Sequence, residues 1–410
     1  MHLRSGRTEL GSFRLQRLVL IEVAAALVLT AWVIDPLAVA PAAAFAVVLV
    51  AFAVVRRHGR SWPEWIATAR DLRARQRLAA EMVIPAGTEP AFAPAVECDP
   101  SLRTYTYSGR DRRQVGIVGD GTFVSAVLQI ESDGTALRAE RTRHPLPVGL
   151  VRDALDVDGI RLESAQIVLH TQPAPALHLP QNSVAVSNYA PLQAQTGAPA
   201  VRITWVALKL DPELCPEAVA ARGGGLIGAQ KCVVRAVDQL ASRLTAAGFR
   251  ATVLNEEEVA AAIATSACAN PLVTAEAGRT ELPERRTEES ARTWRCDNRR
   301  HTTYWVRRWP QLETGRAGGS VPSPSLPQLV ALLTSIPTLA TTFSLTLARG
   351  ERQETSLCGH VRVTGRSDSE LASAQRAVEQ GARRAGTGLV RLDREQLPGM
   401  LATLPLGGTR

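Results

Sequence analysis

The sequence contains almost no lysine and no complete catalytic motif. Lys209 and Lys231 are the only lysines among 410 residues, while arginine and alanine are abundant, a bias typical of a GC-rich genome rather than of a binding chemistry. No Gly-x-Ser-x-Gly elbow and no His-Glu-x-x-His helix is present. The histidines beyond the first hundred residues are scattered: His144, His170, His178, His301 and His360. The sequence therefore offers no set of catalytic residues.

Paired cysteine motifs are also absent. None of the six cysteines forms Cys-x-x-Cys, and none stands at zinc-finger spacing from a histidine. The topology inferred below puts this region in the cytosol, where thiols stay reduced. We therefore expect small buried hydrophobic residues rather than disulfides or metal ligands. The six are Cys98, Cys215, Cys232, Cys268, Cys296 and Cys358.

Positive charge is concentrated at the start of the chain. The formal net charge is +8, and residues 1–77 hold eleven arginines against five acidic residues. The rest of the chain is therefore close to neutral. This distribution favours an anionic membrane surface over nucleic acid as the partner of the basic segment.

Two apolar runs predict a transmembrane helical hairpin over residues 1–60. The runs are 18–34, broken by Glu22, and 37–55, with only Asp35 and Pro36 between them. A cleaved signal peptide is the alternative, but it would have one apolar run and then a cleavage site. Glu22 marks either an ion path or a carboxylate paired near the interface. The flanking arginines predict that both flanks are cytosolic at the bacterial inner membrane; they are Arg14, Arg17, Arg56, Arg57 and Arg60.

Residues 61–95 are expected to form a juxtamembrane amphipathic helix and linker. Ser61 and Glu64 form a capping box, and Trp62 and Trp65 begin an apolar face opposite several arginines. This pattern predicts a helix on the membrane surface with its tryptophans at headgroup level. Packing against a partner's helix would need the same pattern.

The remaining residues predict an α+β duplication. Strand and helix patterns follow the order βαββαβα in 117–267 and again in 301–404. We therefore expect two tandem βαββαβ, ferredoxin-like repeats, at 96–270 and 292–410, joined by a linker at 271–291. A chance resemblance between two α+β stretches is the alternative. The segment 171–200, rich in proline, glutamine and asparagine, is expected to be a loop inserted in the first repeat.

The stretch GFRATVLNEEEVAAAIAT, residues 248–265, raises the question of a carboxylate site. Its counterpart GTGLVRLDREQLPGMLAT, residues 386–403, has a glycine, a capping residue and one first-turn glutamate in the same places. The shared pattern predicts a strand, a helix cap at Asn255 or Asp393, and a helix. Only Glu256 and Glu258, which the second copy lacks, are left as candidates for chemistry.

Two short motifs invite a ligand-binding interpretation. The glycine-rich segment at 222–228 precedes a helix, but it lacks the phosphate-loop spacing, and a flexible helix cap explains it better. Asp156 and Asp158 form an Asp-x-Asp followed by Gly159, which matches the metal motif of many glycosyltransferases and also a turn at a helix end.

The stretch RTWRCDNRRHTTYWVRRWP, residues 292–310, interleaves arginines with aromatic residues. In a β-hairpin it would have one apolar and one basic face. Such a pattern is typical of a core strand with a solvated face, of a protein interface, or of a nucleic-acid groove. The candidate partner-interface residues are Trp294, Trp305, Arg307, Arg308 and Trp309.

The whole chain resembles the EccE family, a membrane-complex subunit of mycobacterial type VII (ESX) secretion systems. The residues that carry this resemblance most firmly are LVLIEVAAALVLTAWVIDPLAVAPAA, residues 18–43, and RRHGRSWPEW, residues 56–65. The resemblance implies a non-catalytic subunit that works beside EccB, EccD and the ATPase EccC in a hexameric inner-membrane assembly. It implies no catalytic residue and no cofactor.

Two functions of different classes remain. The first is a structural subunit that docks at the membrane and contacts its neighbours from the cytosolic side. The second is a membrane-anchored enzyme acting on a nucleotide-sugar or other phosphorylated substrate through Asp156 and Asp158 or the glycine-rich segment. The missing catalytic sets favour the first.

Overall fold

The fold is taken from a computed structural model of the chain. The chain divides into two compact units, with the boundary between Glu81 and Met82. The residues that the structure describes are 8–34, 39–54, 56–57, 60–85, 87–109, 112–132, 145–173, 184, 188, 191, 199, 201–279, 284–310, 325–350 and 354–408.

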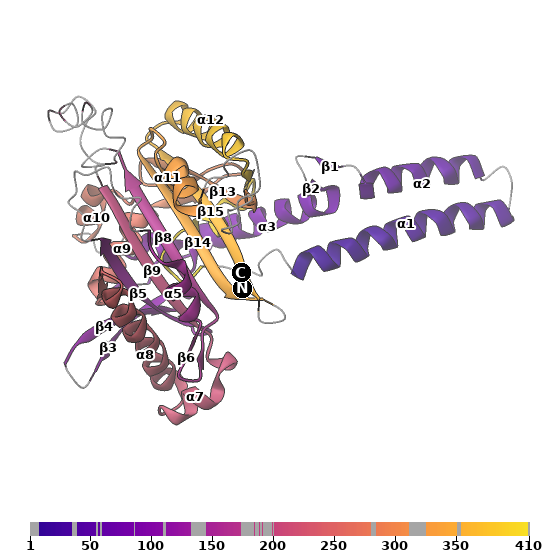
Figure 1. The fold of residues 1–410 in the computed structure, drawn as a ribbon. Coiled ribbons are helices and arrows are strands. Elements are labelled where there is room, and N and C mark those ends of the chain that lie inside the picture. Colours follow the sequence, from indigo (N-terminus) through magenta and orange to yellow (C-terminus); the bar gives the residue numbers. More distant parts are fainter. Residues whose placement is uncertain are drawn as a thin grey trace, which may run out of the picture. The chain divides into compact units, whose positions relative to one another are not determined.

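The first unit is helical. Helices α1 (Thr8–Ile34) and α2 (Val39–Val54) lie against each other, and β1 (Arg56–Arg57) pairs with β2 (Arg60–Ser61) before α3 (Trp62–Glu81) (Figure 1). Within the described residues, no helix is both long enough and apolar enough to cross a membrane. The predicted transmembrane hairpin is therefore wrong. The 16 residues of α2 extend only about 24 Å, against a hydrocarbon core of about 30 Å.

The second unit is built on one antiparallel sheet of 12 strands. Its main path runs β11-β12-β13-β15-β14-β8-β9-β5-β4-β3, with β10 beside β5 and β16 beside β13. The strands are β3 (Arg103–Ser108), β4 (Gln114–Gly119), β5 (Val124–Ser132), β8 (Ser164–Gln172), β9 (Val201–Leu210), β10 (Phe249–Val253), β11 (Thr287–Glu289), β12 (Trp294–Cys296), β13 (Arg299–Arg308), β14 (Ala340–Arg349), β15 (Thr355–Gly365) and β16 (Gly388–Arg391).

This continuous sheet corrects the predicted fold class. Two ferredoxin-like repeats would each have ended at a sheet edge. Instead β8 pairs with β14 along its length, from Thr171 opposite Thr341 to Ser164 opposite Ala348. An unpaired strand edge can pair with another chain, and this pairing removes one such edge from each half of the chain.

Helices cover both faces of the sheet (Figure 1). One face packs against α5 (Val148–Asp153), α8 (Gly225–Ala246), α11 (Leu326–Thr334) and α12 (Asp368–Arg384). The other packs against α4 (Ala93–Cys98), α9 (Glu256–Ser266) and α13 (Gln396–Leu401). The remaining short elements are β6 (Asp156–Val157), β7 (Ile160–Arg161), η3 (Pro212–Leu214), α7 (Pro216–Ala221) and α10 (Pro271–Ala277).

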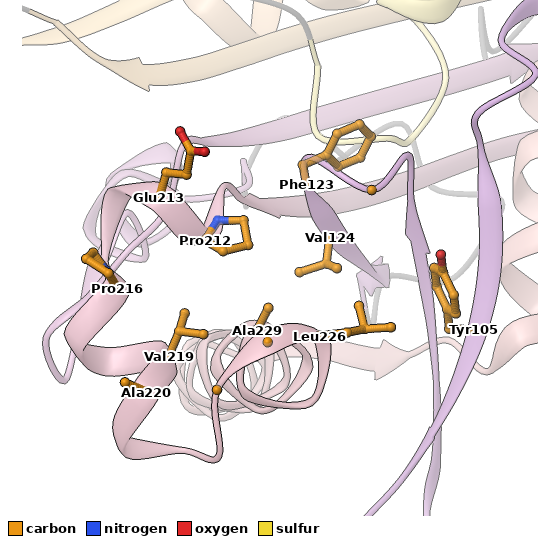
Figure 2. Close-up of a pocket in the computed structure, with 13 residues that line it drawn as sticks. Tyr105, Phe123, Val124, Pro212, Glu213, Pro216, Val219, Ala220, Leu226 and Ala229 are labelled. Carbon is orange, nitrogen blue, oxygen red and sulfur yellow. The ribbon is translucent and has the colours of Figure 1, made fainter.

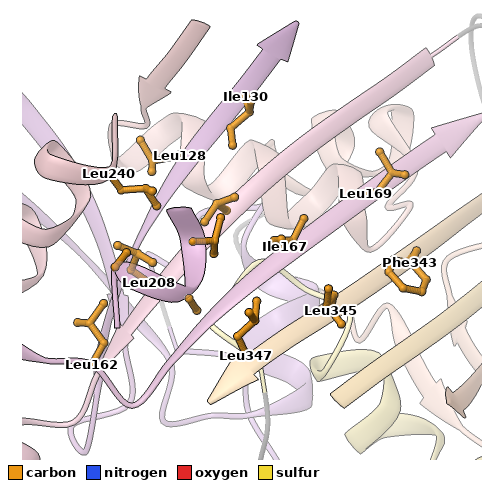
Figure 3. Close-up of a cluster of buried hydrophobic side chains, with 14 of the residues drawn as sticks. Leu128, Ile130, Leu162, Ile167, Leu169, Leu208, Leu240, Phe343, Leu345 and Leu347 are labelled. Atoms are coloured by element: carbon orange, nitrogen blue, oxygen red, sulfur yellow. The ribbon is translucent and has the colours of Figure 1, made fainter. Parts of the chain in front are cut away.

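The two faces of the β8–β14 pair differ in chemistry. Towards α8 and α11 the paired side chains are apolar: Leu345 lies opposite Ile167, and Phe343 lies opposite Leu169 (Figure 3). Burial of such directly opposed side chains stabilises the pairing. Towards α9 and α13 the same strands carry polar residues, and these are also buried.

Residues 402–408 cover part of the polar side of this pair, and all of them are buried. Gln166 on β8 donates to the Ala402 carbonyl and accepts from the Gly407 N–H, each at 2.9 Å. Ser164 donates to the Gly407 carbonyl at 2.8 Å. A side chain at Gly408, where φ is +82°, would overlap Thr346. The two glycines therefore let the backbone lie directly on the strands.

We predict that Leu345→Ala destabilises the whole second unit by about 2–5 kcal/mol, because it leaves a cavity in the core at the β8–β14 pair. Urea unfolding followed by circular dichroism measures the change. Leu357→Ala on β15 is the control, since Leu357 is 46% exposed and its truncation should cost less than about 0.5 kcal/mol. Equal losses for the two variants would contradict a core at this pair.

Candidate protein-interaction surface

The β12–β13 hairpin carries the first of the predicted interface residues. Trp294 is only 1% exposed, and its ring lies 5.0 Å from the ring of His301 between centroids. The turn of the hairpin is fixed by Asp297, which forms a buried ion pair of 2.9 Å with Arg286. Trp294 therefore belongs to the core and is not available to a partner in this fold.

The other four predicted residues gather at the far end of β13. Trp305 lies in register with His360 on β15 and with Val390 on β16, and its side chain is half-buried. Trp309 is also half-buried and packs over Gly359, where a Cβ atom would come within 2.6 Å of its ring. Glycine at position 359 thus makes room for the indole.

Arg307 and Arg308 are both exposed at this end of β13. In a regular strand successive side chains point to opposite faces, but the register against β16 shifts between Val306 and Arg308. Such an irregularity re-aims side chains. The end of β13 therefore carries two exposed guanidinium groups and two half-buried indoles, with Trp309 on the face that packs against α12 and Trp305 on the opposite face; these four residues are here called the β13 surface (Trp305, Arg307, Arg308 and Trp309).

The predicted membrane-interface residues belong to the first unit. Arg14 and Arg17 lie in α1, Arg56, Arg57 and Arg60 in β1 and β2, and Trp62 begins α3; the side chains of these six lie outside the described part of the structure. Trp65 is half-buried and Leu72 is buried. The exposed face of α3 is basic and includes Arg70, Arg73 and Arg77.

The Asp-x-Asp motif is engaged with arginines. Asp156, in β6, forms an ion pair with Arg349 on β14. Asp158 adopts a positive φ of 50° in the turn after β6 and pairs with Arg235 on α8 at 2.8 Å. The two carboxylates therefore anchor the β6–β7 turn rather than facing a common ligand site.

Two of the three glutamates at 256–258 have structural roles. Asn255 and Glu258 form a reciprocal capping box at the start of α9. Glu256 accepts hydrogen bonds from Thr104, at 2.6 Å, and from Thr106 on β3. The predicted strand, cap and helix are confirmed for this stretch. The carboxylates of Glu256 and Glu258, the two candidates for a chemical role, are both hydrogen-bonded within the fold.

The matching prediction for the second copy is wrong at the cap. The carboxylate of Asp393 accepts from the guanidinium of Arg391 at 2.6 Å, so it does not cap a helix. Arg394 then adopts a positive φ of 66°, and α13 begins only at Gln396. The ion pair competes with capping for the same carboxylate.

The sequence did not predict a layer of buried polar side chains on the face of the sheet towards α9. His170 on β8, His301 on β13 and Arg362 on β15 are all fully buried on the α9 side of the sheet. Only the alternation of threonine and serine with apolar residues along β14 could have indicated this layer. That alternation is also the pattern of a strand whose polar face contacts water.

Arg362 has no carboxylate partner among the described residues, and burial lowers its pKa to about 10. Its guanidinium instead donates to the carbonyl of Ser266, the last residue of α9. Arg299 donates to the Cys268 carbonyl nearby, at 2.6 Å. The negative end of the α9 dipole and its free carbonyls therefore compensate for two buried cations.

The buried histidines are held neutral. His170 bonds through Nε2 to the amide nitrogen of Gln172 and through Nδ1 to the Thr342 hydroxyl, at 3.0 and 2.9 Å. An amide nitrogen only donates, so Nε2 must accept and carry no proton. Burial lowers the pKa of His170 to about 3 and that of His360 to about 4, and it also lowers the pKa of His301. Across the described residues, no three His, Cys, Asp or Glu side chains are placed to hold a metal ion.

We predict that the unfolding free energy of the second unit falls as pH is lowered from about 6.5 towards 4. In this window the unfolded chain protonates its histidines, at an ordinary pKa of about 6.5, while the buried His170, His301 and His360 stay neutral. Each such histidine adds about 1.4 kcal/mol per pH unit to the slope. Urea titrations at several pH values measure it. His170→Gln should reduce the slope by about 1.4 kcal/mol per pH unit, the contribution of one histidine. A slope unchanged by this substitution would contradict the conclusion that His170 stays neutral in the folded protein.

Comparison with known proteins points to one family. A family model described as "Putative type VII ESX secretion system translocon, EccE" matches residues 198–306. No curated protein matches the chain. The matched segment runs from β9 through α8 and α9 to β13, so it contains the glycine-rich turn, the three glutamates and part of the β13 surface. Over this segment the predicted resemblance to the EccE family of type VII secretion components is confirmed.

Proposed function

We propose that this chain is a non-catalytic structural subunit of a type VII secretion complex at the bacterial plasma membrane. In this proposal the N-terminus and the second unit lie on the cytosolic side, and the neighbours are the EccB, EccC and EccD subunits. The match of residues 198–306 to the EccE family is the observation that carries the proposal. It supports a component of the translocon, and the assignment of partners is ours.

The environment of the candidate catalytic groups supports a non-catalytic role. Asp156 and Asp158 are paired with arginines, and Glu256 and Glu258 are hydrogen-bonded within the fold. A general base or nucleophile needs a side chain free to reach a substrate. No observation favours the alternative of an enzyme that acts on a nucleotide-sugar.

The β13 surface is the proposed contact with a neighbouring subunit. Arginine and tryptophan are the residues most enriched at the energetic centres of protein interfaces. Here the indoles of Trp305 and Trp309 are already held by the sheet, so a partner would not need to order them. Arg307 and Arg308 would provide charged hydrogen bonds to a partner's carboxylates.

We predict that Arg307→Glu with Arg308→Glu lowers recovery of the other translocon subunits with the tagged chain by about tenfold or more, because truncated hot-spot contacts cost at least about 2 kcal/mol. Purification in detergent followed by quantitative mass spectrometry measures the recovery. The matched control is Arg383→Glu with Arg384→Glu, which makes the same charge change at exposed positions on α12. Equal recovery for both variants would contradict the proposed contact, and a wild-type chain that purifies alone would contradict the proposed function.

The basic face of α3 is the proposed contact with anionic lipid. Arg70, Arg73 and Arg77 are exposed along one helix, and the flanking Arg56, Arg57, Arg60, Trp62 and Trp65 would extend this contact. Each arginine near an anionic bilayer contributes about 1 kcal/mol at moderate ionic strength.

We predict that Arg70→Glu, Arg73→Glu and Arg77→Glu together reduce the preference of the full chain for anionic over neutral vesicles by about 100-fold or more. Flotation with phosphatidylglycerol-containing and pure phosphatidylcholine vesicles measures this ratio. Charge reversal of Arg376, Arg383 and Arg384 on α12 is the control. If the control lowers the ratio as much, the preference comes from net charge and α3 is not the contact.

A further inference from the structure

The two ends of the 12-stranded sheet have different surroundings. At the β3 end, Tyr105 on β3 and Leu226 on α8 help to line an apolar pocket of about 480 Å³ (Figure 2). At the β11 end, the backbone of the last strand meets charged side chains, one from α4 and one from the residues just before β11. Charged groups that bond to the backbone of an end strand bear directly on whether that strand can pair with another.

The backbone of β11 has one outward-facing pair of polar groups at Thr287. β11 ends the path of the sheet, so within the described part of the sheet one of its edges has no neighbouring strand. On the other edge, the Asp297 N–H donates to the Arg286 carbonyl and the Ser290 N–H donates to the Thr293 carbonyl, each at 2.8 Å. These bonds alternate along an antiparallel pair, so the N–H and the carbonyl of Thr287 point away from β12.

Two side chains take the positions that a neighbouring strand would occupy. The Thr287 N–H donates to the Glu97 carboxylate at 2.7 Å, and Nε of Arg285 donates to the Thr287 carbonyl at 2.8 Å. The Arg286 N–H, at the start of the strand, also donates to Glu97, at 3.0 Å. A neighbouring strand would offer a carbonyl and an N–H here. The carboxylate and the guanidinium form the same two bonds, and their charges make these bonds stronger.

The segment that carries Glu97 is also held at a second point. The guanidinium of Arg286 donates to the Pro90 carbonyl and to the Thr274 hydroxyl, both at 2.8 Å, and it forms the ion pair with Asp297. Residues 92–97 are all buried. The segment 90–97 is therefore fixed against β11 at both ends, so the carboxylate stays at the strand edge.

Placing a carboxylate at this position costs free energy. Glu97 is only 2% exposed, and burial raises its pKa because the charged form loses its water. Apolar side chains such as Ala95 and Val96 already pack α4 into the core, so docking the helix does not need a charge at position 97. The carboxylate does what these side chains cannot do, because it gives the outward N–H of Thr287 a partner.

We propose that Glu97 and Arg285 close the β11 edge of the sheet against pairing with a second copy of this chain. Two copies present the same outward N–H and carbonyl at Thr287, and two such strands can pair antiparallel about a two-fold axis. The two side chains prevent this by giving both groups their partners within one chain. The inference goes beyond the proposed function and does not depend on it.

The test is photo-crosslinking of the full chain, purified in detergent, with Glu288→p-benzoylphenylalanine as the probe on β11. Glu288 is exposed, and its ion pair with Arg295, at 2.9 Å, is a surface pair whose loss costs little. We expect Glu97→Ala with Arg285→Ala to raise the yield of crosslinks from position 288 to residues 287–296 of a second copy about tenfold or more, because Thr287 then has no partner within its own chain.

The matched control is Gln166→Ala, which removes the hydrogen bonds of a fully buried side chain at the β8–β14 pair and leaves the β11 edge closed. Its crosslinking yield should equal that of the chain with the probe alone. An equal rise in the control would show general loosening of the fold, and no rise in the double variant would show that the edge needs no closure; either result overturns the inference.

A second variant decides the question if circular dichroism shows that the double variant does not fold. Glu97→Gln keeps the shape of the side chain, but it replaces one carboxylate oxygen by an NH₂ donor that faces the backbone N–H groups of Arg286 and Thr287. We expect this variant to raise the same crosslinking yield above that of Gln166→Ala. A yield no higher than that of the control would overturn the inference.

Discussion

The pairing of β8 with β14 is the interaction on which the second unit depends. It joins two halves that would each expose a strand edge, and it makes them one antiparallel sheet of 12 strands. Apolar pairs such as Leu345 with Ile167 hold one side of this junction. The other side is polar, yet it is buried, so every group there needs a partner within the protein. The arrangement of α9, α13 and residues 402–408 follows from that requirement.

Arg362 meets this requirement through its two Nη atoms, while its buried Nε has no hydrogen-bond partner among the described residues. A buried guanidinium without a carboxylate would be costly, and here the carbonyl end of α9 takes the place of the anion. The arginine comes from the second half of the sheet and the helix from the first. The same crossing occurs where residues 402–408 bond to Gln166 and Ser164 on β8. Each half therefore satisfies polar groups of the other, and the two cannot be separated without leaving buried groups unpaired.

Local patterns in the sequence predicted most helices and strands. The features that could not be predicted depend on contacts between residues far apart in the chain. The Gly248 turn, the Asn255 cap and the apolar face of α9 are encoded within eighteen residues, and they form as expected. The pairing of β8 with β14 joins strands about 180 residues apart, and the sequence of neither strand specifies which other strand it pairs with. Asp393 could cap a helix or bind Arg391, and only the folded chain decides between them. Trp294 and Trp305 share one basic-aromatic stretch, but the sequence does not say that one is core and the other half-buried.

The proposed function needs the sheet to hold the β13 surface rigidly. The β13 surface lies in the second half of the sheet, so its position relative to the first half is fixed only if the β8–β14 junction is permanent. Native-state hydrogen exchange of the full chain tests this most directly. The amides of β8 and β14 should exchange as slowly as those of β9 and β15, through global unfolding alone, while β3 at the sheet edge exchanges faster. Exchange of β8 and β14 at the rate of β3 would show two sheets that separate, and it would contradict the account.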